Sequence, residues 1–158
     1  MTVMGNRQDK VRVYALDRGT VIDHIRQGQA LRVLRLLSLD AETTVAMGMS
    51  FDSSKLGRKD IIKFEDFFLE EETAKRIALI APEATVAKID GGKVIEKYQV
   101  AVPDNIDGFM SCANPKCITR NEPMKTRFTK ACNGGDIRFR CHYCERTMDE
   151  NDVRDHLL

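Results

Sequence analysis

Five cysteines lie in the last third of the chain, and the first 111 residues contain none. Four of them form two close pairs, Cys112-x4-Cys117 and Cys141-x2-Cys144, with 23 residues between the pairs. Thiolates at such short spacing can turn onto one ion, and tetrahedral Zn²⁺ accepts four sulfur ligands at ~2.3 Å. The spacing favours one zinc ion per chain over ordinary buried cysteines, while iron–sulfur ligation stays open as an alternative. Four cysteines leave no open coordination position, so we expect a structural rather than a catalytic metal.

The segment after residue 103 is too small to be stable without help from a ligand or cross-link. It spans roughly 55 residues, a length at which a hydrophobic core alone is marginal. Metal binding can contribute on the order of 10–16 kcal/mol to the folding of such modules. The fifth cysteine, Cys132, has no partner at short spacing and is interpreted as a spare thiol.

The clustering of cysteines also indicates two domains. A turn-rich segment at residues 103–108 combines a proline with Asn, Asp and Gly, which break regular structure. We therefore predict an N-terminal domain at residues 1–102 and a small all-β zinc-ribbon or rubredoxin-like domain at residues 103–158.

Charge and hydropathy exclude several classes of protein. Lysine and arginine number 25 against 24 acidic residues, a formal net charge of +1, so no overall basic excess favours DNA or an anionic membrane. No apolar run approaches the ~20 residues that a membrane helix needs. The first seven residues lack the apolar stretch of a secretory signal, so we expect a cytoplasmic protein with reduced cysteines.

The first hundred residues alternate between strand and helix patterns. Val11, Val13 and Ala15 alternate with polar residues and predict a first strand, and an amphipathic helix is expected at residues 30–37. Residues 45–51 and 61–64 predict a hairpin, and a second helix follows three glutamates and ends before Pro82. Residues 85–89 and 94–98 flank a glycine turn. The order is β-α-β-β-α-β with one added strand, an α+β chain whose N-terminal domain is a ferredoxin-like split βαβ fold.

Four segments of the chain together match one known family. They are RGTVIDHI (residues 18–25), GRKDIIK (57–63), LIAPEATV (79–86) and the four-cysteine ending. In this order, and over nearly the whole chain, they resemble the regulatory chain of aspartate carbamoyltransferase. The resemblance implies a non-catalytic regulator of pyrimidine biosynthesis that binds the nucleotide effectors CTP, UTP and ATP, with or without Mg²⁺. It also implies that the N-terminal domain pairs with a second regulatory chain and that the zinc domain contacts the catalytic chains.

The resemblance further implies an effector site. Its candidate residues are Leu16, Asp23, His24, Lys59, Lys63, Gly92 and Lys97. A nucleoside triphosphate needs cations for its phosphates and hydrogen-bond partners for its ribose hydroxyls, and these residue types supply both.

By resemblance, each side chain of this set has a distinct role. His24 and Lys97 would meet the phosphates, Asp23 and Lys63 would lie near the ribose, and Lys59 would add positive potential. A single lysine on a strand is usually only a solvated residue, so the prediction rests on their joint occurrence.

The remaining members, Leu16 and Gly92, would contact the base through their backbone. Three positions depart from the family pattern. Ala87 stands where an asparagine is common, Gly92 where a tyrosine is common, and Lys116, between the first two cysteines, where an amide residue is common. Each cysteine pair with its adjoining turn is called a knuckle. Asn114 in the first knuckle and Glu145 in the second keep the family pattern.

Two other classes compete with this interpretation. A split-βαβ domain joined to a zinc ribbon also suits an RNA-binding or transcription-associated protein, but 6% aromatic content and no tryptophan disfavour base stacking. An enzyme is the third class. The sequence contains no Walker loop, no GxGxxG and no open His-containing metal site, so no catalytic residues are predicted.

Overall fold

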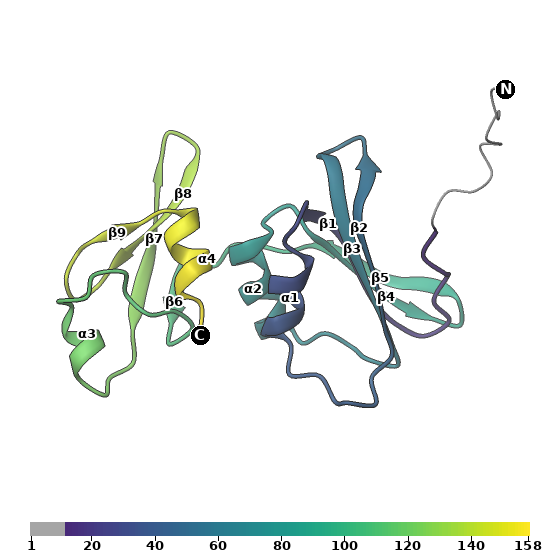
Figure 1. Cartoon of the computed structure of the whole chain (residues 1–158), viewed down its shortest axis with the longest axis horizontal. Coiled ribbons are helices and arrows are strands. Elements are labelled where there is room, and N and C mark those ends of the chain that lie inside the picture. The colour runs from purple at the N-terminus through teal and green to yellow at the C-terminus, as the bar shows by residue number, and fades with distance from the viewer. Residues whose placement is uncertain (1–11) are drawn as a thin grey trace, which may run out of the picture.

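The computed structural model describes residues 12–158 and contains two separate antiparallel sheets (Figure 1). The N-terminal sheet and its helices are built from the first seven elements. These are β1 (Gly19–Arg26), α1 (Ala30–Leu36), β2 (Val45–Ser53), β3 (Gly57–Glu65), α2 (Glu71–Ile80), β4 (Thr85–Asp90) and β5 (Lys93–Gln99).

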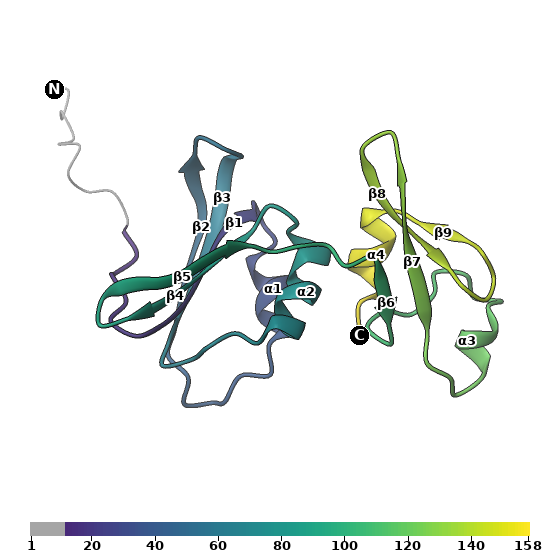
Figure 2. The same ribbon diagram turned by 180° about the vertical axis from the view of Figure 1, so that it is seen from behind.

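The strand order β2-β3-β1-β4-β5 is that of a split βαβ fold with one added edge strand. Every neighbouring pair is antiparallel, and α1 and α2 lie together on one face of the sheet (Figures 1 and 2). Ile62, Ile22 and Val86 stand side by side in register on β3, β1 and β4, and all three are buried. The α+β fold expected for this domain is confirmed.

The first strand is not where the sequence pattern placed it. Residues 12–16 are not a strand, and Tyr14 is almost fully exposed, while Val11 and the first seven residues lie outside the described part. The strand β1 begins instead at Gly19, whose φ of 137° suits glycine, and a Cβ there would collide with the Phe64 carbonyl. Its alternation is interrupted between Ile22 and Ile25 by a bulge at His24, where φ is 57°.

The C-terminal part is a four-stranded sheet in the order β6-β7-β8-β9, with two short helices. The small β domain was expected, but the helices were not. Its elements are β6 (Asn105–Asp107), α3 (Ile118–Asn121), β7 (Arg127–Asn133), β8 (Asp136–Cys141), β9 (Thr147–Met148) and α4 (Glu150–His156).

The two parts meet at an apolar interface, which we call the seam. Leu79 on α2 is buried in the C-terminal core with Phe139 and Val153, and a void of only about 10 Å³ remains beside it. That volume holds at most about one water molecule, so the seam is closely packed. Val102 packs against both cores.

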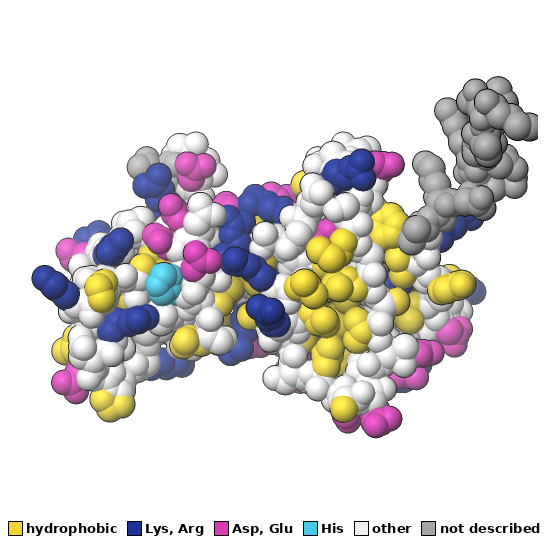
Figure 3. All heavy atoms as spheres, viewed as in Figure 1, with side chains coloured by type: hydrophobic (Ala, Val, Ile, Leu, Met, Phe, Trp, Pro, Cys, Tyr) yellow, Lys and Arg dark blue, Asp and Glu magenta, His cyan; other side chains and the backbone are white. Residues whose placement is uncertain are grey.

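Surface hydrophobicity is concentrated on the N-terminal part. Figure 3 shows apolar side chains gathered on its face in this view, and its exposed apolar residues include Leu31 on α1 and Met47 and Met49 on edge strand β2. Of the helices in residues 12–158, none is long and apolar enough to cross a membrane.

Candidate metal centre and nucleotide site

The four predicted cysteine ligands converge. Their sulfur atoms all lie within 4.8 Å of one another, with Cys112 Sγ 3.6 Å from Cys144 Sγ and Cys117 Sγ 3.9 Å from Cys141 Sγ. A tetrahedron with ~2.3 Å metal–sulfur bonds has sulfur–sulfur edges of about 3.8 Å. A disulfide would instead need about 2.05 Å. The cluster therefore fits one tetrahedral ion of the kind that Zn²⁺ forms.

Local backbone geometry turns each pair onto the ion. In the first knuckle, Asn114 Oδ1 accepts a hydrogen bond from Lys116 N, and the Asn114 carbonyl accepts one from Cys117 N. In the second, Glu145 N donates to the Cys141 carbonyl while Glu145 adopts a φ of 62°. These tight turns are what allow two- and four-residue spacers to bring their thiols together.

Burial makes the site chemically distinct from the fifth cysteine. Burial raises the pKa of the Cys112 thiol, and also that of Cys141. For Cys144, burial raises the pKa, but hydrogen bonds outweigh it and lower the pKa to about 7. These bonds come from the Arg146 N–H and from the side chains of Asn114, Cys112 and Cys141. Cys132 is exposed and belongs to no such cluster within residues 12–158. A divalent cation bound among the four clustered thiols would take the place of their protons.

The sheet face opposite the helices carries the predicted nucleotide residues. Strand register aligns Lys63, Val21, Ala87 and Lys97 in one row across β3, β1, β4 and β5. Because side chains alternate along a strand, this row faces away from the side that Ile22 packs against the helices. Three strand spacings separate the two lysines by about 14 Å, with two small apolar residues between them.

A second cluster lies at the bulge of β1. The Lys59 ammonium is 2.8 Å from Asp23 Oδ1, and Asp23 also accepts a 2.6 Å hydrogen bond from His24 N. A 3.0 Å hydrogen bond joins His24 Nδ1 to Thr85 Oγ1 on β4. Asp23 therefore contacts both Lys59 and His24.

Electrostatics set the charge states of this cluster. Burial of Asp23 opposes its ionisation, but hydrogen bonds from Lys59 and His24 N outweigh it and hold the pKa below its ordinary value. For His24, burial lowers the pKa and the Asp23 carboxylate opposes it, while the nearby charges of Lys59, Lys55 and Lys97 lower the pKa further. These three lysines supply positive potential that an anion near the ring would favour.

The segment before β1 completes the arrangement. Lys63 Nζ donates a 2.7 Å hydrogen bond to the Tyr14 carbonyl, and Gly92 N donates a 2.9 Å hydrogen bond to the Asp17 carbonyl. Leu16, half-buried, lies between these two attachment points. These contacts bring Leu16, Lys63 and Gly92 to one edge of the sheet face opposite the helices, which we call the polar face.

The structure does not bring all seven residues into contact. Lys97 is exposed on edge strand β5 and joins the others through strand register rather than through a direct bond. Thr85 and Val21 were missed by sequence reasoning. The signal for both is register, because Thr85 pairs with Asp23 and Val21 lies between Lys63 and Ala87.

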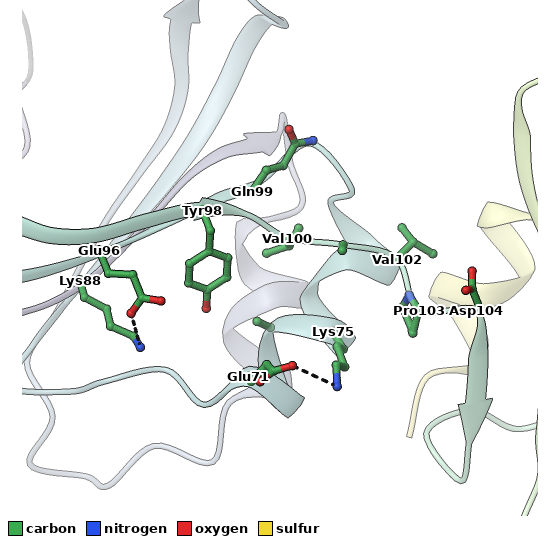
Figure 4. A pocket seen from close by; sticks show the side chains of 12 residues that line it. Glu71, Lys75, Lys88, Glu96, Tyr98, Gln99, Val100, Val102, Pro103 and Asp104 are labelled. Atoms are coloured by element: carbon green, nitrogen blue, oxygen red, sulfur yellow. Dashed lines mark ion pairs between the residues drawn. The ribbon is translucent and has the colours of Figure 1, made fainter.

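A separate cavity of about 480 Å³ lies between β5, α2 and the linker (Figure 4). It contains none of the seven predicted residues. Its lysines are already paired, Lys88 with Glu96 at 2.6 Å and Lys75 with Glu71 at 3.4 Å. Charge compensation makes this cavity a poor receptor for a polyphosphate.

Comparison with known proteins identifies a family for each part of the chain. Residues 11–101 match the family described as aspartate carbamoyltransferase regulatory chain, allosteric domain, and residues 104–154 match the metal binding domain of that chain. The alternative of an RNA-binding or transcription-associated protein is not supported by these matches.

Relatives match over nearly their full length. The aspartate carbamoyltransferase regulatory chain of Thermococcus sibiricus is 49% identical over 149 residues, covering 94% of this chain and 99% of the relative. That of Pyrococcus abyssi is 47% identical over 147 residues, covering 91% and 96%. That of Serratia marcescens is 40% identical over 146 residues, covering 92% and 95%. The chain therefore belongs to the family of aspartate carbamoyltransferase regulatory chains, which are non-catalytic and combine an allosteric domain with a metal-binding domain.

Proposed function

We propose that the polar face of the N-terminal sheet binds the nucleotide effectors CTP, UTP and ATP, with or without Mg²⁺. The observation that carries this proposal is the register row that sets Lys63 and Lys97 on one face beside the Asp23–His24–Lys59 cluster. Lysines at the two ends supply cations, while Asp23 supplies an acceptor for ribose hydroxyls. Val21 and Ala87 offer a flat apolar floor between them.

Titration calorimetry of the three nucleotides into the assembled protein tests the site. A charge-assisted hydrogen bond contributes about 1.5–3 kcal/mol, so Lys97→Ala is expected to weaken triphosphate binding roughly 10- to 150-fold. Lys75→Ala is the matched control, because it removes a lysine from the opposite side of the sheet, where it lines the cavity of Figure 4. Equal affinity in Lys97→Ala and wild type, or a larger loss in Lys75→Ala, would move the site elsewhere.

The second part of the proposal concerns the metal. One Zn²⁺ per chain is held by Cys112, Cys117, Cys141 and Cys144, whose sulfur spacing fits it. Zinc would supply cross-linking of the two knuckles rather than chemistry, because four thiolates leave no open position. Its ligands must stay reduced, which suits the cytoplasmic location expected from the sequence.

The metal-binding domain would dock onto aspartate carbamoyltransferase catalytic chains, as the resemblance implies. In support, the relatives are named as regulatory chains of that enzyme. The second knuckle offers an exposed tip at Glu145, which pairs with Arg140 at 3.0 Å. The boundary between this domain and the nucleotide domain is placed near residue 102. In support, Val100 packs in the first core, Ile106 in the second and Val102 against both.

The N-terminal domain would pair with a second regulatory chain. Edge strand β2 has no neighbour on one side within the described sheet, and it exposes Met47 and Met49. Unpaired strand edges with exposed apolar residues readily accept another chain.

A further inference from the structure

An arginine at the end of β1 joins the two domains. Arg26 Nε and Nη2 donate hydrogen bonds of 2.9 and 2.6 Å to the two carboxylate oxygens of Glu83, in the turn between α2 and β4. Its third nitrogen, Nη1, donates a 2.7 Å hydrogen bond to Glu150, the first residue of α4 in the metal-binding domain. The three side chains are each about one-third exposed, so solvent screens this bridge only in part.

Arg26 belongs to the same bulged segment as the proposed effector residues. It follows Asp23 by three positions, with the bulge at His24 between them, and it pairs across the sheet with Lys59. Lys59 is also the ion-pair partner of Asp23. An anion that draws Lys59 and His24 toward itself would therefore act on the strand segment whose last residue is Arg26.

The bridge divides the donors of Arg26 between the two domains. The guanidinium binds Glu83 in bidentate fashion within its own domain and Glu150 through a single nitrogen across the domain boundary. If Glu150 is released, Arg26 remains neutralised by Glu83, so no unpaired buried charge results. The contact between domains can thus open and close without unfolding either domain.

We propose that Arg26, held between Glu83 and Glu150, is the positioning residue through which nucleotide binding at β1 changes the orientation of the metal-binding domain. This inference rests on the proposed nucleotide site. When Arg26 releases or rebinds Glu150, the packing around Leu79 between the two domains changes. The resulting change in orientation of the metal-binding domain is then passed to its partner chain.

The structure offers a matched control on the same helix. Asp155 of α4 also makes an ion pair across the boundary, to Arg32 on α1 at 3.2 Å, but α1 carries none of the proposed nucleotide residues. Glu150→Ala and Asp155→Ala each remove one carboxylate from α4 and one ion pair between domains. Only Glu150→Ala removes a partner of Arg26, the arginine on β1.

The experiment measures coupling in the assembly of this chain with its catalytic chains. CTP is titrated by calorimetry into wild type, Glu150→Ala, Asp155→Ala and Arg26→Lys, each with and without a bisubstrate analogue. The ratio of the two CTP affinities is the coupling factor. Metal content and sedimentation establish that each variant is folded and assembled.

We expect Glu150→Ala to bind CTP within about 2-fold of wild type while its coupling factor falls roughly 2- to 5-fold, the effect of one partly exposed ion pair. Arg26→Lys should lose coupling similarly, because an ammonium cannot replace the bidentate fork. Asp155→Ala should couple as wild type does.

Two results would overturn the inference while leaving the nucleotide site in place. One is an unchanged coupling factor in Glu150→Ala. The other is an equal fall in Asp155→Ala, which would indicate general loosening of the domain contact. A wild-type assembly that binds no CTP would overturn the nucleotide site, and this inference with it.

Discussion

Removal of the metal should unfold residues 103–158 and leave the N-terminal domain folded. At about 0.05–0.15 kcal/mol per residue, a domain of roughly 55 residues has about 3–8 kcal/mol of stability in total. Binding of a four-thiolate zinc ion contributes on the order of 10–16 kcal/mol. Since the second value exceeds the first, the C-terminal domain cannot remain folded without its ion. The N-terminal core around Ile22, Phe64 and Ile77 contains no cysteine and should persist.

Cys141→Ser/Cys144→Ser is the perturbation, with Cys132→Ser as the control because Cys132 is exposed and outside the cluster. Metal content is measured by atomic absorption, and the fold of each domain by amide hydrogen exchange. The double variant should lose the ion, the protection of β7 and β8, and sedimentation with the catalytic chains. Nucleotide binding should survive. Stoichiometric zinc in the double variant, or a protected C-terminal sheet without zinc, would refute the reasoning.

Two further predictions follow from the charge states and the packing. Since burial and nearby lysines lower the pKa of His24, a bound triphosphate should raise that pKa again; binding then takes up a proton, so CTP affinity increases as the pH falls from 8 to 6. Calorimetry in buffers of different ionisation enthalpy measures this uptake, and His24→Gln should lose it. Leu79→Ala should cost about 2–4 kcal/mol of unfolding free energy, because this buried side chain lies in the seam between the two domains. Leu31→Ala, at a 47% exposed position on α1, should cost under about 0.5 kcal/mol in the same denaturant titration.

Regular alternation made most of the N-terminal fold predictable, and the error lies at the first strand. Strands β2 to β5 and both helices follow from periodicity, although β2 also has a register shift, between Gly48 and Phe51. In β1 the bulge at His24 breaks the period of two. The exposed segment that includes Val13 and Ala15 matches the alternating pattern better than β1 does.

The short helix α4 escaped prediction for a different reason. It has seven residues, and only Val153 among them is buried, so no apolar face is visible in the sequence. The available signal was the capping box, in which Asp149 accepts hydrogen bonds from Asn151 N and Asp152 N and Asp152 reaches back to Asp149 N. Four polar residues of this kind are common in loops, so the cap alone decides little.

Recognition of the polar face depended on more than single residues. Lys63 and Lys97 are 34 positions apart, and only the strand order puts them in one row. The family resemblance named both lysines, and the split βαβ order predicted from the sequence accounts for their lying in one row. Sequence reasoning could not reach the His24–Thr85 contact, since the side-chain direction at a bulge depends on the local backbone.

One feature of the sequence indicates the contact between the domains, namely the uninterrupted apolar run at residues 77–81. A helix that covers one sheet face needs a single apolar stripe, yet Ile77 and Ile80 are buried in the N-terminal core while Leu79 is buried in the C-terminal one. A helix that is apolar on two sides requires two partners, so the run indicates that α2 lies between two cores. Because α2 is shared, the domains cannot separate without exposing Leu79, and any reorientation must be a small shift about this helix. An ion pair at the rim of such a seam, like that of Arg26 with Glu150, is placed where a small shift makes or breaks it.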